Sequence, residues 1–376
     1  MIEKLFTLER SIPESVAMGV LSGKYSIHGG VIRDAGGKIV RHLVPAASSA
    51  LNPMGLISAP FDVFNTFQLR DIAKTTQQLV GMSQATMALS GLNLAVSAVG
   101  FAVLYNSLKK VDDRVKAIDK KVSWIKTFLE SERRATLLLA ADELSSLPGD
   151  TSHRTHILHS SRERLGHASM HYREHLESAD DLMEAMAYQH FFCTAFLMRA
   201  RCSAELGMFD NAVRELKAGT TDWLKESQRI AKGMILGDGP ERFLQKDYVE
   251  ILPSAKLAEW MDFAHAENRG IAWIDTLRSN YSESSVARIK GLFSSGLDKS
   301  ESEQVVFMHN LVARSSVLEG YKSQYECFLE NKITPSAFYE GIDGLTQENS
   351  VDGMYILAPT QAAAAESRAG ETALEP

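Results

Sequence analysis

The spacing of apolar and polar positions changes along the chain, and each spacing predicts a different element. Residues 1–60 combine a short helix, which begins at a capping box from Ser11 to Glu14, with two β-rich runs. These runs, 25–33 and 38–43, flank a glycine turn and predict a β-hairpin. An isolated hairpin is marginal in water, so we expect it to pack against another part of the chain.

From residue 61 onward the pattern is helical, with no proline between Pro60 and Pro148. Further helices are expected near 255–278, 284–293, 301–329 and 335–345. The predicted fold class is mainly α. Its parts are a small N-terminal helix and β-hairpin unit at 1–60, a long coiled-coil-forming helix at 61–148, a helical domain at 149–357 and a disordered tail at 358–376.

The long helix contains a stretch without charged side chains, between Lys74 and Lys109. Inside it, residues 87–105 are mostly apolar, and about 20 such residues can cross a bilayer core. A central helix buried in a large helical domain is also apolar all round, so both interpretations stand. The ends and faces of this predicted membrane segment are defined by Met87, Ala88, Gly91, Asn93, Ala95, Ser97, Ala98, Gly100, Ala102 and Tyr105.

The faces of this segment differ. One face carries small residues, which let helix backbones approach closely in lipid. Another carries bulky apolar residues, and a third is small and polar. The polar face suits either the interior of a membrane-spanning bundle or ordinary hydrogen bonding within a protein core. The polar face consists of Thr86, Ser90, Asn93, Ser97 and Gly100, and the bulky face of Leu89, Leu92, Val96, Val99 and Val103.

Beyond the uncharged stretch, the polar face continues as an apolar seam flanked by charged residues. Its members recur at alternating spacings of three and four, which is typical of coiled-coil a and d positions. The seam therefore predicts self-association through 104–129. Its residues are Leu104, Leu108, Val111, Val115, Ile118, Val122, Ile125 and Leu129.

Flanking charge predicts an orientation. Seven Lys or Arg residues lie within the 20 positions after Leu108, against Arg70 and Lys74 in the 20 positions before Met87. If the segment spans a membrane, the positive-inside rule places its C-terminal side in the cytoplasm. The first ten residues mix charged with single apolar side chains, so no signal peptide is expected there. The expected location is membrane-associated with a cytoplasmic C-terminal domain, or cytoplasmic if 87–105 is buried.

Composition narrows the partners. The chain has 376 residues, 45% of them hydrophobic and 23% charged, as in ordinary folded proteins. A net charge of −7 argues against nucleic-acid binding. Three cysteines form an odd number without paired spacing, so reduced thiols are expected.

The segment 199–212 resembles the inter-helix turn of a tetratricopeptide repeat. Gly207, Phe209 and Ala212 stand where that pattern has a small residue, an aromatic and a small packing residue. The resemblance covers one hairpin, and no second copy follows at the repeat period. It implies a helix pair within the C-terminal domain, with a surface that could accept a protein partner.

Signals for catalysis are weak. His159, Glu163, His167, His171 and His175 follow one another at i+4 spacing, which is typical of a surface stripe and allows a pH-responsive face or, less well, a metal site. No nucleophile motif is present. Asp275 and Glu319 are the carboxylates expected to be buried, and Trp223, Trp260 and Trp273 are expected in the core.

The sequence therefore predicts a non-enzymatic helical protein without a cofactor, with a lipid bilayer and further copies of itself as partners. The plan of a long coiled helix with an uncharged stretch is similar to that of α-helical pore-forming proteins, in architecture alone. The alternative is a soluble scaffold or adaptor in which 87–105 is a buried central helix. An enzyme is a third interpretation, which depends on the histidines and the two carboxylates alone.

Overall fold

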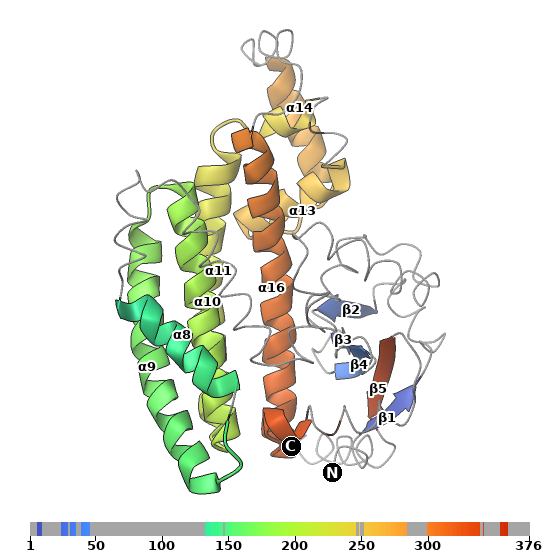
Figure 1. Ribbon diagram of the computed structural model, residues 1–376. Helices are drawn as coiled ribbons and strands as arrows, with labels where there is room; N and C mark the ends of the chain where they lie inside the picture. The colour runs from blue at the N-terminus through green and yellow to red at the C-terminus, as the bar shows by residue number, and fades with distance from the viewer. Residues whose placement is uncertain are drawn as a thin grey trace, which may run out of the picture. The chain divides into compact units, whose positions relative to one another are not determined.

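The computed structural model describes residues 6–9, 24–28, 31–34, 39–45, 132–145, 147–245, 248, 252–283, 299–338, 341 and 354–359. Within these residues the protein is mainly helical (Figure 1), as the sequence predicts. The chain forms two compact units, each made of separate stretches. The first unit comprises 1–168, 194–218 and 316–376, and the second comprises 169–193 and 219–315.

Figure 1 shows four long helices, α9, α10, α11 and α16. Each of them contributes residues to both units. The helices are α8 (Glu132–Ser145), α9 (Thr151–Ser178), α10 (Leu182–Glu205), α11 (Phe209–Arg229), α13 (Ser254–His265), α14 (Ala272–Glu283) and α16 (Lys299–Asn331). A π-helix, η3 (Ile230–Leu236), and a 3-10 helix, η4 (Pro240–Leu244), follow α11.

Side chains and a glycine fix the ends of these helices. The Asp150 carboxylate accepts a hydrogen bond from the backbone N–H of His153 at 2.7 Å, and Asp181 does the same for Glu184 at 3.0 Å, so both act as N-caps. The turn between α10 and α11 lies at the predicted place. There Gly207 has a φ of +73°, a left-handed conformation that favours glycine at a helix C-terminus.

A five-stranded antiparallel sheet belongs to the first unit, in the order β1-β5-β4-β3-β2. In β3, Ile32 is buried, and the register with β4 shifts between Ile32 and Arg33. The boundary expected at residue 357 falls within the last strand. The strands are β1 (Phe6–Glu9), β2 (Tyr25–His28), β3 (Val31–Asp34), β4 (Ile39–Pro45) and β5 (Met354–Pro359).

Aromatic side chains fill the helical core. In the first unit, the ring of Phe328 lies 5.2 Å from that of Phe338. In the second unit, Phe243 meets Trp260 edge to face at 5.8 Å. Trp223, Trp260 and Trp273 are all buried, as the sequence predicts.

The helix expected over 255–278 is wrong as a single element, because the structure divides it into α13 and α14. Ala266 ends α13 in the left-handed conformation, with φ at +53°. The carboxylate of Asp262 then accepts hydrogen bonds from the backbone N–H groups of Arg269 and Gly270, and from the indole N–H of Trp273 at 2.9 Å. This one side chain satisfies three donors of the turn and so stabilises the break.

Candidate functional site

The predicted membrane segment 87–105 and the predicted seam 104–129 both lie outside the described residues. Within the described part of the chain, no helix is both long enough and apolar enough to cross a membrane. The structure therefore brings together a different set of polar groups, which lie in the described helices.

The most unusual of these is a polar cluster around Arg314, in the part of α16 that belongs to the second unit. One Nη of Arg314 donates a hydrogen bond to Oε1 of Gln189 at 2.8 Å, and the other lies 2.8 Å from Nδ1 of His190. Oε1 of Gln189 also accepts a hydrogen bond from the indole N–H of Trp223 at 2.9 Å. Helices α10, α11 and α16 thus meet through one amide oxygen.

The chemistry of the cluster fixes its charge. A guanidinium is always a donor, so Nδ1 of His190 must accept and the imidazole is neutral, with its proton on Nε2. Burial, and then the positive charge of Arg314, hold the pKa of His190 well below its usual 6.5. Burial raises the pKa of the neighbouring Cys193 thiol to about 11, against the opposing effect of Arg314, so this thiol is neutral too.

Arg314 is therefore the charged member of the cluster. Burial lowers the pKa of its guanidinium, and the Cys193 thiol opposes that shift, but an arginine stays protonated in proteins. Among the residues that the structure describes, no carboxylate forms an ion pair with Arg314. A guanidinium in a helical core without a bonded counter-charge is the feature that most needs an explanation.

Other buried charges in the described helices are compensated. In the first unit, the fully buried Glu205 carboxylate pairs with Arg154 at 3.0 Å and accepts hydrogen bonds from the backbone N–H and the hydroxyl of Ser336 at 2.9 and 2.7 Å. Glu215 similarly accepts a hydrogen bond from Arg162 at 2.5 Å and lies 3.3 Å from Arg199.

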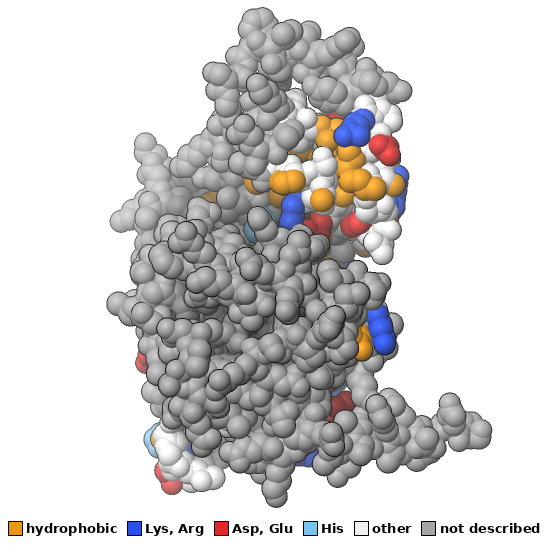
Figure 2. Space-filling view, turned by 90° about the vertical axis from the view of Figure 1, so that its right-hand side faces the viewer, with side chains coloured by type: hydrophobic (Ala, Val, Ile, Leu, Met, Phe, Trp, Pro, Cys, Tyr) orange, Lys and Arg blue, Asp and Glu red, His pale blue; other side chains and the backbone are white. Residues whose placement is uncertain are grey.

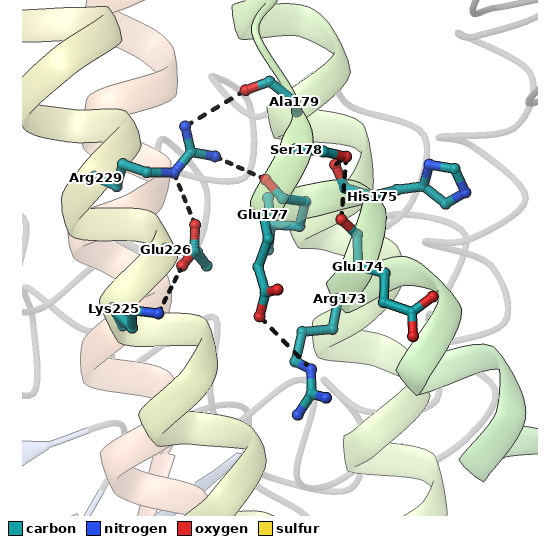
Figure 3. A network of polar contacts seen from close by, with 10 residues as sticks. Arg173, Glu174, His175, Glu177, Ser178, Ala179, Lys225, Glu226 and Arg229 are labelled. Atoms are coloured by element: carbon teal, nitrogen blue, oxygen red, sulfur yellow. Dashed lines mark hydrogen bonds and ion pairs between the residues drawn. The ribbon is translucent and has the colours of Figure 1, made fainter.

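A second compensated network joins the ends of α9 and α11 in the second unit (Figure 3). Arg229 donates to the carbonyl oxygens of Leu176 at 2.7 Å and Ala179 at 3.4 Å, and to the carboxylate of Glu226 at 2.7 Å. Glu226 is buried and also lies 3.5 Å from Lys225. The arginine thereby satisfies carbonyl groups that the end of α9 leaves without helical partners.

The histidine stripe of α9 lies on the surface in part. His159 and His167 are exposed, whereas His171 and His175 are half-buried, with their rings 4.4 Å apart. The His175 ring stacks on Tyr188 at 5.0 Å. Where residues are described, no group of three or more His, Cys, Asp or Glu side chains is placed to hold a metal ion.

The three cysteines are free and buried, as expected for reduced thiols. Burial raises the pKa of Cys202 and of Cys327 to about 12. A thiol with a raised pKa is protonated near neutral pH and is a poor nucleophile.

The expectation of buried carboxylates at Asp275 and Glu319 is wrong for the first and holds only in part for the second. The Asp275 side chain is 82% exposed and that of Glu319 is 32% exposed. The carboxylates that are buried, Glu205 and Glu226, each have arginine partners. The sequence did contain an indication that Arg314 is unusual, since it is the only charged residue between Glu303 and Glu319.

One exposed face carries hydrophobic side chains among charged ones, over the segment that contains α13 and α14 (Figure 2). Ile271, in the turn between these helices, is 64% exposed. The Asp262 carboxylate accepts hydrogen bonds from the backbone of this turn, at Arg269 and Gly270. The described part of the chain contains no contact that covers this side chain of Ile271.

Comparison of the chain with protein-family models, with curated proteins and with solved structures gave no match.

Proposed function

We propose that this protein is a non-enzymatic, membrane-associating helical protein that self-assembles through a coiled coil at 104–129 and perturbs membranes in the manner of a pore-forming effector. The observation that carries the proposal is the uncharged stretch between Lys74 and Lys109, followed directly by a charged, heptad-spaced stretch. The first suits lipid and the second suits water, so one helix could join the two environments.

The described helices support the non-enzymatic part of this proposal. All three thiols have raised pKa values, and the pKa values of His190 and His309 are lowered, chiefly by burial. Catalysis of acid–base or nucleophilic type needs groups whose pKa values are moved toward neutral pH with substrate access. The thiols are moved in the direction that keeps them protonated and unreactive, as in a structural core.

Vesicle binding and leakage test the membrane role. The full-length protein is mixed with dye-loaded vesicles of phosphatidylcholine, with and without anionic phosphatidylglycerol, and bound protein is separated by flotation. We expect both flotation and dye release. Asn93→Leu should keep flotation and reduce release, because it makes the polar face apolar. Asn106→Leu, just beyond the segment, is the matched control and should leave both unchanged. The proposal would be refuted if the protein neither floated with nor released dye from vesicles of either composition.

Sedimentation tests the self-assembly. Val115→Asp with Val122→Asp places two charges in the seam and should give a smaller species, since burying an unpaired charge costs several kcal/mol. Ala117→Asp with Ser123→Asp adds the same charge at outer heptad positions and is the control. An unchanged species in the seam variant would remove this part of the proposal.

The alternative function, a soluble scaffold or adaptor, has one specific observation in its favour. The α10–α11 hairpin turns at Gly207 with Phe209 and Ala212 buried behind it, as the resemblance to a tetratricopeptide turn implies. The flotation experiment separates the two functions. Extraction as a monodisperse species without detergent, together with absence from floated vesicles, would favour the scaffold.

A further inference from the structure

We infer that Arg314 is the anchor of a small oxyanion site in the second unit, which takes a phosphate or carboxylate group between α10 and α16. This inference is independent of the membrane function, because it uses described residues alone.

The cluster around Arg314 carries a net positive charge. Arg314 carries a positive charge, while His190 is held neutral by the hydrogen bond to its Nδ1 atom and Cys193 stays a thiol. Gln189 and Trp223 add no charge. Within the described residues, Glu205 and Glu226 show how this fold treats charges that it buries, since each has an arginine partner at 3.0 Å or less. A charge that is partly desolvated and has no counter-charge is unfavourable, so a negative group is expected beside Arg314.

Arg314 also has more hydrogen-bond donors than it uses within the cluster. A guanidinium has five N–H groups, and Arg314 uses two of them for Gln189 and His190. Its remaining N–H groups meet no acceptor among the described residues. Oε1 of Gln189 already accepts hydrogen bonds from Arg314 and Trp223. The remaining N–H groups of Arg314 can therefore take an acceptor from outside the described residues, and oxyanions accept from a guanidinium in bidentate fashion.

Arg314 as a whole residue is half-buried, and desolvation lowers the pKa of its guanidinium. The cluster also has a scaffold that holds its shape: Trp223 is fully buried and fixes Gln189, and His190 fixes the other side of the guanidinium.

Titration calorimetry with sodium phosphate and, separately, sodium acetate at constant ionic strength tests the site in the full-length protein. We expect one of the two anions to bind and to raise the melting temperature, which also separates phosphate from carboxylate chemistry. Arg314→Gln should weaken binding by about tenfold or more, because the charge-assisted hydrogen bonds are lost. Arg278→Gln removes an exposed arginine of α14 and is the matched control, with unchanged binding expected.

A second variant keeps the test decisive if Arg314→Gln does not fold. Gln189→Glu has nearly the same shape and still offers oxygens to Trp223 and Arg314, but it supplies the negative charge internally. We expect this variant to melt at a higher temperature than the wild type and to lose the response to anions. Any one of three results would overturn the inference: the wild type binds neither anion, Arg314→Gln binds as strongly as the wild type, or Gln189→Glu melts at a lower temperature than the wild type.

Discussion

The Glu205 carboxylate links three parts of the first unit, so its replacement by glutamine tests how far this unit depends on one buried charge. Oε2 accepts a hydrogen bond from Arg154 in α9 at 3.0 Å. Oε1 accepts from the N–H and hydroxyl of Ser336, beyond the end of α16, and lies 3.6 Å from Nε of Arg201. Glutamine has the same size but one oxygen, so in either orientation its NH₂ must face a donor.

The expected cost follows from these contacts. A hydrogen bond to a charged group contributes roughly 1.5–3 kcal/mol, and breaking a fully buried pair costs about 3–5 kcal/mol. The Arg154 side chain is 31% exposed and can reach water once its partner is lost, which lowers the cost. We therefore expect Glu205→Gln to reduce the free energy of unfolding by about 2–3 kcal/mol.

Glu177→Gln is the matched control, because it makes the same chemical change at an exposed ion pair. Glu177 lies 3.8 Å from Arg173, and the two side chains are 50% and 41% exposed. Such surface pairs contribute roughly 0–1 kcal/mol. Urea unfolding followed by circular dichroism gives both values, and hydrogen exchange of the Ser336 amide reports the local loss. Equal effects of the two substitutions, with an unchanged exchange rate at Ser336, would refute the reasoning.

Three further outcomes are expected. Stability should fall as the pH drops below about 6.5, because His190 takes up a proton there in the unfolded chain, whereas its pKa in the folded protein lies well below that value. Urea unfolding midpoints at several pH values measure this, and His190→Asn should reduce the dependence of the midpoint on pH. Gly207→Ala should cost about 1 kcal/mol in urea unfolding, since φ is +73° at this position, whereas Gly149→Ala, where φ is not positive, should cost nothing similar. Arg229→Met should cost about 1–2 kcal/mol in the same assay by removing the donor to the end of α9 and the partner of the buried Glu226, and no loss would contradict the network of Figure 3.

Features set by local sequence were predicted well. The turn at Gly207 and the mainly helical character follow from residue types within a few positions of each other. The burial of the tryptophans follows from their size and apolarity. The break between α13 and α14 was missed although Gly270 was visible, because what stabilises it is one carboxylate, Asp262, folding back on donors seven to eleven positions later.

The candidate site could be predicted only in part. Arg314 stands out as an isolated charge in an apolar stretch, but its partners Gln189 and His190 are 125 and 124 positions away. Glu205 and Ser336 are 131 positions apart. Such pairings depend on how helices pack, and periodicity within one helix contains no information about them. Asp275 was mistaken for a core residue for the same reason, since apolar neighbours in sequence do not determine which face of α14 is covered.

The described helices and the uncharged stretch have opposite physical requirements, and this bears on how a membrane-perturbing protein of this kind could work. Ion pairs at Glu205 and Glu215 fasten helices of the first unit together, and Arg229, the partner of Glu226, joins the ends of α9 and α11 in the second unit. Breaking these contacts in lipid would leave charges without partners. Residues 87–105 contain no charged side chain that could lose a partner in this way. If the proposed function holds, the free-energy cost of moving from water into lipid is therefore lowest for the stretch without charge. The ion-paired helices would then keep their fold in water while that stretch enters the bilayer.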